Sequence, residues 1–315
     1  MTGTPSDSEI LVFDVAMRVR FRGQDRRSGV LLRGPAGWGE FSPFPDYDDE
    51  TCARWLQAAR ESAYDGWPAP VRDRVPVNTT VPAVGPQQAH AMVAASGCTT
   101  AKVKVAERGQ TLADDIARVE AVRDALGPTG KVRVDANAAW TVDEAAQALR
   151  ELNRFDLEYA EQPVASLEDM AALRRRTSVL LAADESVRRA EDPLRVAGLE
   201  AADIVVLKVQ PIGGVRACLD VAEACGLPVV VSSAIETSVG IAAGVALAAA
   251  LPDLPYACGL GTVQLLADDV TPDPLLPVDG HLPVRAVAPE PALVKADDDT
   301  RQWWLRRMEA ADARR

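Results

Sequence analysis

The sequence is poor in the residues that build disulfide frameworks and zinc sites. Its 315 residues include five cysteines and two histidines, and no C-x-x-C pair occurs. An odd number of widely spaced cysteines argues against a disulfide framework and favours reduced, buried thiols. The opening residues, MTGTPSDSEI, lack a basic segment followed by an apolar one, so we expect no signal peptide and a cytoplasmic protein.

Long apolar runs and basic clusters are also missing. The most apolar stretch, residues 239–251, is shorter than the roughly 18 residues of a membrane-spanning helix, so it predicts a buried helix. Lys and Arg number 34 against 46 Asp and Glu, which gives a net charge of −12. This balance argues against a nucleic-acid or membrane partner. An anionic ligand must be attracted locally, by a metal ion or a few lysines.

The glycine-rich loops of nucleotide-binding sheets are absent, since neither G-x-G-x-x-G nor G-x-x-x-x-G-K-[ST] occurs. From residue 75 onward, short apolar runs alternate with helical segments. These strand candidates are residues 75–81, 100–105, 131–135, 157–161, 179–185, 203–209, 228–233 and 255–259. Eight strands with helices between them predict a closed parallel (β/α) barrel, which we place at residues 75–264.

The N-terminal 74 residues have a different pattern and predict a separate unit. Residues 10–33 form two apolar stretches around a polar segment at 23–28, which indicates a hairpin, and residues 51–64 have a helical pattern. Residues 268–289 are rich in Asp and Pro and predict irregular structure. Residues 295–315 predict a terminal helix or a loosely held tail.

Ionisable or polar residues end six consecutive strand candidates. In chain order they are Lys104, Asp135, Glu161, Asp184, Lys208 and Ser232, at intervals of 31, 26, 23, 24 and 24 residues. Because the carboxyl ends of parallel barrel strands share one face, we expect these side chains to converge.

Three carboxylates on successive strands, at Asp135, Glu161 and Asp184, suggest a metal site. Each taken alone is an ordinary turn or helix-cap residue. Together in one barrel mouth they would repel one another, and a divalent cation would neutralise them. Oxygen-only ligation favours Mg²⁺, with Mn²⁺ as a substitute, whereas the histidines that zinc prefers, His90 and His281, lie outside these strand ends.

Lysines flank the expected carboxylate cluster. Lys102 and Lys104 alternate with Val103, so both point to the same side of their strand. Inside the barrel, burial would lower the pKa of a lysine toward that of a useful base, while on a solvent-facing edge both would be ordinary surface residues. Lys208 interrupts the apolar run IVVLKV and either reaches outward from the strand end or serves in the site. The whole set suits proton removal next to a metal-held substrate carboxylate.

These residues carry a family resemblance. The segments KVK, DAN, EQP, DES and VLKVQPIGG resemble the barrel motifs of the enolase superfamily, in its muconate-lactonising-enzyme subgroup, and GWGEFSPFPDY is similar to that family's capping domain. The resemblance implies a (β/α)7β TIM-like barrel with an α+β capping domain. We expect the capping domain to comprise residues 1–74, with residues 265–315 packed against it.

The resemblance also implies roles for individual residues. Asp135, Glu161 and Asp184 match the metal ligands, Lys104 the base, Lys102 its electrostatic helper, and Lys208 the lysine on the opposite face. The residues expected around them are Asn137 and Glu185, in the same motifs as the ligands, and Ser232, Ser233, Gly261 and Phe44, toward the substrate. Glu185 has the alternative role of a helix cap, and Phe44 that of packing the cap.

The loop FSPFPDY and the segment SSAIETS are most similar to those members of the subgroup that act in menaquinone biosynthesis. Those members dehydrate 2-succinyl-6-hydroxy-2,4-cyclohexadiene-1-carboxylate through an Mg²⁺-stabilised enediolate, as carbon-oxygen lyases. A small carboxylate is therefore the expected ligand. Three alternatives share the motifs: an N-acylamino acid racemase or dipeptide epimerase, a muconate cycloisomerase, and a catalytically silent binding scaffold. The sequence does not indicate the oligomeric state.

Overall fold

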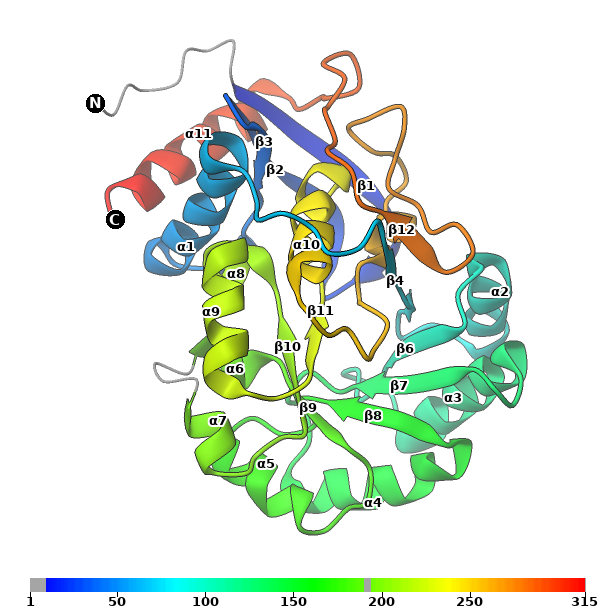
Figure 1. Cartoon of the computed structure of the whole chain (residues 1–315). Helices are drawn as coiled ribbons and strands as arrows, with labels where there is room; N and C mark the ends of the chain where they lie inside the picture. Colours follow the sequence, from blue (N-terminus) through cyan, green and yellow to red (C-terminus); the bar gives the residue numbers. More distant parts are fainter. Residues whose placement is uncertain (1–9, 190–193, 315) are drawn as a thin grey trace.

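The computed structural model describes residues 10–189 and 194–314, which form a barrel under a smaller cap (Figure 1). Seven parallel strands run in chain order around the barrel, and three antiparallel strands form the cap sheet. The barrel strands are β5 (Thr79–Val81), β6 (Thr100–Lys104), β7 (Lys131–Asp135), β8 (Leu157–Glu161), β9 (Leu181–Ala183), β10 (Ile204–Leu207) and β11 (Val229–Val231). The cap strands are β1 (Ile10–Phe21), β2 (Gln24–Gly34) and β3 (Gly37–Phe41).

An eighth, very short strand position closes the barrel. Cys258 forms a parallel bridge with Val77 and Gly259 forms one with Ser232, so this segment joins the β11 edge to the β5 edge. Backbone hydrogen bonds from Asn78 N to Cys258 O (2.9 Å) and from Gly259 N to Val231 O (2.8 Å) make the closure. The predicted (β/α)7β barrel is confirmed.

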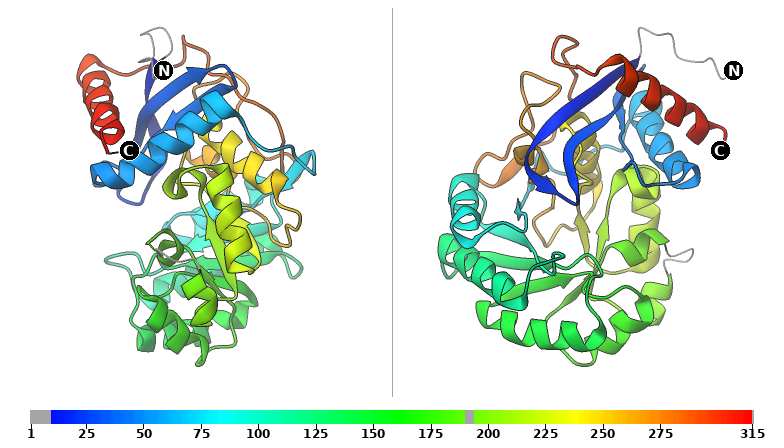
Figure 2. Two further views of the ribbon diagram at one scale, coloured as in Figure 1. Left: turned by 60° about the vertical axis from the view of Figure 1, so that its left-hand side comes forward. Right: turned by 180° about the vertical axis from the view of Figure 1, so that it is seen from behind.

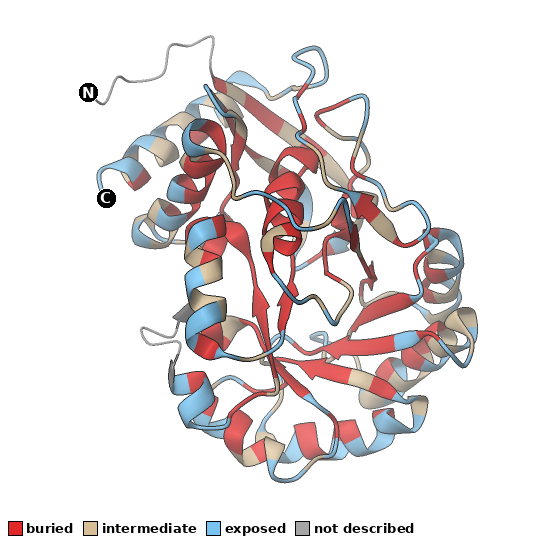
Figure 3. Cartoon of the chain, in the orientation of Figure 1, coloured by how far each residue is buried: buried red, intermediate tan, exposed pale blue. Residues whose placement is uncertain are grey.

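Helices cover the outside of the sheet and support the cap. Those of the barrel are α2 (Pro86–Ser96), α3 (Leu112–Leu126), α4 (Val142–Leu152), η3 (Asn153–Phe155), α5 (Leu167–Arg174), α6 (Glu185–Arg189), α7 (Leu194–Gly198), α8 (Val209–Ile212), α9 (Val215–Cys225), α10 (Ser238–Ala250) and η4 (Gly261–Leu265). Thr111, Thr141 and Ser166 cap α3, α4 and α5 by accepting hydrogen bonds from backbone N–H groups in the first turn. The apolar stretch predicted to be a buried helix is α10, which is buried along nearly its whole length (Figure 3).

The cap combines the N-terminal hairpin with helices from both ends of the chain. Helix α1 (Asp49–Arg60) continues into the π-turn η2 (Glu61–Asp65), and α11 (Asp298–Asp312) lies beside α1 and the cap sheet in both views of Figure 2. Trp304 of α11 is buried against Phe41, with ring centroids 5.9 Å apart. Helix α11 therefore packs on the N-terminal segment, while the division into domains at residues 74 and 264 stays a prediction.

Three local expectations were wrong. The hairpin turns at Arg22 and Gly23, not over residues 23–28, because both residues take positive φ (51° and 73°) and make a tight two-residue turn. Residues 75–81 do not form one strand. Their first part belongs to β4 (Arg74–Pro76), which pairs with β12 (His281–Pro283), so the segment predicted to be irregular contains a short strand.

All five cysteines are free and buried, in agreement with the prediction of reduced thiols. Among the described residues, no helix is both long enough and apolar enough to cross a membrane.

A buried carboxylate of the cap docks on the barrel. Glu40, on β3, accepts hydrogen bonds at Oε2 from the Thr237 and Gly240 backbone N–H groups (3.1 Å each), at the N-terminus of α10. The position suits a negative charge because the helix N-terminus has unpaired N–H groups and a positive dipole end. Burial and the nearby Glu236 nevertheless raise the pKa of Glu40 to about 7.

This pKa predicts a pH-dependent stability of the cap interface. Because the pKa of Glu40 is raised from 4.5 to about 7, the folded state binds more protons between these values, and the free energy of unfolding falls as the pH rises. Between a pH below 4.5 and a pH above 7, ionisation of Glu40 lowers the free energy of unfolding by about 3 kcal/mol. Urea unfolding of Glu40→Gln and wild type from pH 4.5 to 8 should show the variant gaining relative stability with pH. An equal difference at every pH, as expected for the exposed control Glu50→Gln, would contradict this.

Candidate active site

The three predicted carboxylates lie together at the carboxyl ends of neighbouring strands. Asp135 ends β7 and is the Cα partner of Glu161, which ends β8, while Asp184 directly follows β9. All three side chains are buried. The parallel register therefore brings together residues 26 and 23 positions apart in the sequence.

Three lysines pair with these carboxylates. Lys102 Nζ lies 2.7 Å from Glu161 Oε1 and 3.2 Å from Asp135 Oδ2. Lys104 Nζ lies 2.5 Å from Asp135 Oδ2, and Lys208 Nζ lies 2.6 Å from Asp184 Oδ2. Lys102 and Lys104 thus face the barrel interior, and the surface-edge alternative for this pair is wrong.

The pKa values of the two lysines of β6 are shifted in opposite directions. Burial acts to lower the pKa of Lys102, but the attraction of Glu161 and Asp135 outweighs it and holds the pKa well above its usual value. Burial, aided by repulsion from Lys102, lowers the pKa of Lys104 despite its contact with Asp135. One lysine is thereby kept as a cation while its neighbour is brought closer to the state of a base.

The donor set fits a divalent cation. Within residues 10–189 and 194–314, no three His, Cys, Asp or Glu side chains are grouped closely enough to hold a metal ion, and lysine ammonium groups lie among the three carboxylates. Glu161 Oε2 is nevertheless buried without a hydrogen-bond partner. Burial and the adjacent Asp135 raise the pKa of Glu161 to about 7, and a cation bound beside this carboxylate would stabilise its charged form.

A small cavity of about 30 Å³ lies over these groups, between barrel and cap. Phe21, Arg22 and Phe44 of the cap line it, as do Lys102, Lys104, Asp135 and Lys208 below. The other lining residues come from strand ends and following loops: Thr80, Asn137, Ser232, Ser233, Ala234, Ile235, Gly259 and Thr262.

The remaining predicted residues are placed as follows. Asn137 Oδ1 accepts a hydrogen bond from Lys104 Nζ, and Asn137 Nδ2 donates to Glu185 Oε1 (3.1 Å), so both lie next to the carboxylates. Ser232, Ser233 and Phe44 line the cavity. Gly261 does not line it. A Cβ at Gly261 would lie 2.8 Å from Asn78 O, so this glycine permits close backbone packing.

Several lining residues were not predicted, among them Arg22, Thr80 and Thr262. Arg22 is at the tip of the cap hairpin, with its guanidinium 4.2 Å from the Phe44 ring centroid. Arg22 reaches the barrel mouth only because the cap folds over the barrel, and no local pattern in the sequence indicates that contact. Thr262 is bonded to Ser233, with 2.7 Å between their hydroxyl oxygens.

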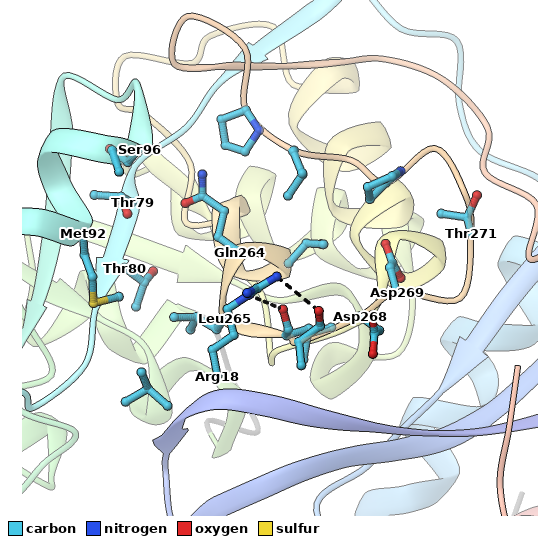
Figure 4. Close-up of a pocket in the computed structure, with 18 of the residues that line it drawn as sticks. Arg18, Thr79, Thr80, Met92, Ser96, Gln264, Leu265, Asp268, Asp269 and Thr271 are labelled. Carbon is cyan, nitrogen blue, oxygen red and sulfur yellow. Dashed lines mark hydrogen bonds between the residues drawn. The ribbon is translucent and has the colours of Figure 1, made fainter. Parts of the chain in front are cut away.

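A larger cavity, of about 840 Å³, lies outside the barrel between α2 and residues 263–277 (Figure 4). Its cation, Arg18, donates to the backbone oxygens of Leu266 (2.8 Å) and Ala267 (3.1 Å). The Arg18 guanidinium already has backbone acceptors in residues 266 and 267, and the larger cavity lacks the lysines and carboxylates of the smaller one. We therefore place the active site in the smaller cavity.

Comparisons with known proteins agree with the geometry. The family model described as enolase C-terminal domain-like matches residues 86–289, and the one described as enolase N-terminal domain-like matches residues 12–63. The o-succinylbenzoate synthase of Thermobifida fusca (strain YX) is 66% identical over 295 residues, 93% of each chain. That of Mycolicibacterium smegmatis is 52% identical over 320 residues, 99% of this chain and 98% of the relative.

Solved structures show the same fold at low identity. The L-Ala-D/L-Glu epimerase of Bacillus subtilis has a TM-score of 0.75 at 24% identity, covering 91% of this chain and 97% of the other. The muconate lactonizing enzyme of Pseudomonas fluorescens has a TM-score of 0.76 at 23% identity, covering 94% and 97%. Family models, close relatives and fold together confirm the resemblance. The chain belongs to the enolase superfamily and, within it, to the o-succinylbenzoate synthase family.

Proposed function

We propose that this chain dehydrates 2-succinyl-6-hydroxy-2,4-cyclohexadiene-1-carboxylate to 2-succinylbenzoate, in the cytoplasm, as a step of menaquinone biosynthesis. The observation that carries the proposal is the 66% identity to an o-succinylbenzoate synthase over 93% of both chains, together with the intact lysine and carboxylate set. A silent scaffold has no need for four ion pairs between lysines and buried carboxylates at the strand ends, so the intact set argues against it.

Asp135, Glu161 and Asp184 would hold the divalent cation. Mg²⁺ fits best, with Mn²⁺ as a substitute, because all three ligands are hard carboxylate oxygens. When bound, the cation supplies a Lewis acid for the substrate carboxylate and stabilises the charge that develops there. The chain's own side chains then have to position the substrate and move its protons.

Lys104 is the base in this proposal. Its pKa is lowered, it faces the cavity, and its contact with Asn137 fixes the ammonium position. Lys104 removes the proton on the carbon α to the ring carboxylate. In a syn elimination the same lysine returns a proton to the departing hydroxyl, which leaves as water, and the ring becomes aromatic. Lys102 stays charged beside it and stabilises negative charge.

Lys208 approaches the site from the other side of the carboxylates. It follows β10, whereas Lys104 ends β6, and the carboxylates come from the three strands between. A cation in this position stabilises the carbanion-like state without abstracting a proton.

The cap must move for the substrate to enter. A cavity of about 30 Å³ is smaller than a substituted cyclohexadiene, and Phe21, Arg22 and Phe44 close it on the cap side. The hairpin tip is the element expected to open, because it carries two of these three residues, Phe21 and Arg22.

Replacing Lys104 tests the base directly. We expect Lys104→Ala to lower kcat by roughly 10³-fold, since positioned general bases contribute factors of this order. The matched control Lys131→Ala removes an exposed lysine at the start of β7 and should leave kcat unchanged. Activity is followed by absorbance of the aromatic product and folding by circular dichroism. Near-wild-type turnover in a folded Lys104→Ala protein would remove Lys104 from this role.

Cation binding should be visible without any assay of activity. We expect Mg²⁺ to raise the Tm of the wild-type protein, because a ligand that binds only the folded state stabilises it. Asp184→Asn should abolish the rise, while the exposed control Asp253→Asn should keep it. Thermal unfolding with and without Mg²⁺ measures this. An equal rise in Asp184→Asn would place the cation elsewhere.

The buried lysine on each side also suits a racemase, the second candidate function. A two-base racemase exchanges the α-proton of both enantiomers of its substrate, whereas the synthase uses Lys104 alone. We expect the cyclohexadiene carboxylate to be turned over faster than N-acyl amino acids. Mass spectrometry in deuterium oxide would support the racemase if both enantiomers of an N-acyl amino acid gained deuterium at comparable rates.

A further inference from the structure

A buried arginine of the cap lies between two loops that line the active-site cavity. Arg27, on β2, is only 2% exposed, yet it forms no ion pair within 4 Å among the described residues and does not line the cavity itself. Its neighbour on the strand, Arg26, is exposed and pairs with Asp14 at 2.8 Å. Burying a guanidinium is costly, so its partners indicate what it does.

Among the described residues, all the hydrogen-bond partners of the Arg27 side chain belong to the two loops. Nε donates to the backbone oxygen of Ile235 (3.0 Å), and Nη2 donates to that of Ser42 (2.6 Å) and more weakly to that of Ala234 (3.4 Å). Ile235 and Ala234 line the cavity on the barrel side. The Ser42 loop continues to Phe44, which lines it on the cap side. One rigid, planar cation thus joins both walls.

The barrel loop needs such support. Ile235 has φ of 65°, in the left-handed region that β-branched residues rarely adopt. Arg27 binds the carbonyl of this residue, and Glu236 Oε2 accepts from the Ala234 N–H (2.6 Å), so the turn is held from both sides. A strained backbone persists only where its surroundings fix it, and strain of this kind collects at ligand sites.

Ser42, which accepts a hydrogen bond from Arg27, also contacts the segment that follows Lys208. Ser42 Oγ donates to Glu40 Oε1 (2.7 Å), and Ser42 N donates to Gln210 Oε1 (3.2 Å). Gln210 is two residues after Lys208 on the segment that follows β10. The Arg27 guanidinium is also 4.5 Å from the Phe44 ring centroid, within the range of a cation–π contact.

We infer that Arg27 is a positioning residue that fixes the 234–235 turn and the Ser42–Phe44 loop, and so sets the walls that hold the part of the substrate far from the metal site. This role rests on the proposed function, since the substrate is the dicarboxylate named there. Arg27 contacts none of the three lysines or three carboxylates around the cation, so its loss affects binding of the substrate more than the chemical step.

The test compares Arg27→Met, which keeps much of the side-chain length, with Arg27→Lys and the exposed control Arg26→Met. We expect Arg27→Met to raise KM and the Kd of 2-succinylbenzoate by about tenfold or more, because small displacements of positioning groups have effects of this size. The kcat value should change by less than about threefold, as for lost uniform binding. The KM and Kd of Arg27→Lys should lie between those of the wild type and Arg27→Met, since one ammonium group cannot span both loops.

Steady-state kinetics and calorimetric product binding supply these values, and the Mg²⁺-induced rise in Tm should persist in every variant. KM and Kd equal to those of Arg26→Met would overturn the inference, as would a fall in kcat at unchanged KM. If neither Arg27 variant folds, Arg27 serves the cap interface alone and the inference is wrong. Absence of turnover in the wild type is a separate outcome, which contradicts the proposed function.

Discussion

The structure depends on charge neutralisation inside the mouth of a barrel. Three buried carboxylates at the ends of β7, β8 and β9 are tolerable only because cations lie among them, and the chain supplies three lysines from β6 and β10. This arrangement holds the lysines in unequal states. Lys102 is stabilised as a cation, while the pKa of Lys104 is lowered, which suits the proposed roles of an electrostatic group and a base on one strand.

The cap meets the barrel through buried polar contacts as well as through the residues that line the cavity. Glu40 reaches the N-terminus of α10, and Arg27 joins the cap loop to the turn after β11. These contacts fix the cap relative to the barrel loops beside the cavity. A protein built in this way can keep its reacting groups on the rigid barrel and change its substrate through the loops above it.

Much of the site could be predicted from the sequence because parallel strands impose simple geometry. Strand ends spaced one βα unit apart must meet at one face, so the spacing alone groups Lys104, Asp135, Glu161, Asp184 and Lys208. Alternation around Val103 likewise placed Lys102 beside Lys104. The roles given to these residues remain proposals, as do the domain boundaries.

The rest follows from tertiary contacts that have no local pattern. Gly261 was expected at the substrate, but it packs against the Asn78 backbone, and close packing of two backbones has no sequence period. Arg27 binds carbonyl oxygens 207 and 208 residues away, which any residue type could supply. The tight hairpin turn was missed because polar residues on an exposed strand resemble those of a loop.

The central claim is that Asp135, Glu161 and Asp184 form one cation site flanked by lysines. A crystal structure with Mn²⁺, measured at an X-ray energy where manganese scatters anomalously, tests it most directly. We expect a single strong anomalous peak within about 2.4 Å of an oxygen of each carboxylate, with Lys104 and Lys208 on either side. A peak elsewhere, or carboxylates still paired only with lysines at saturating Mn²⁺, would contradict it.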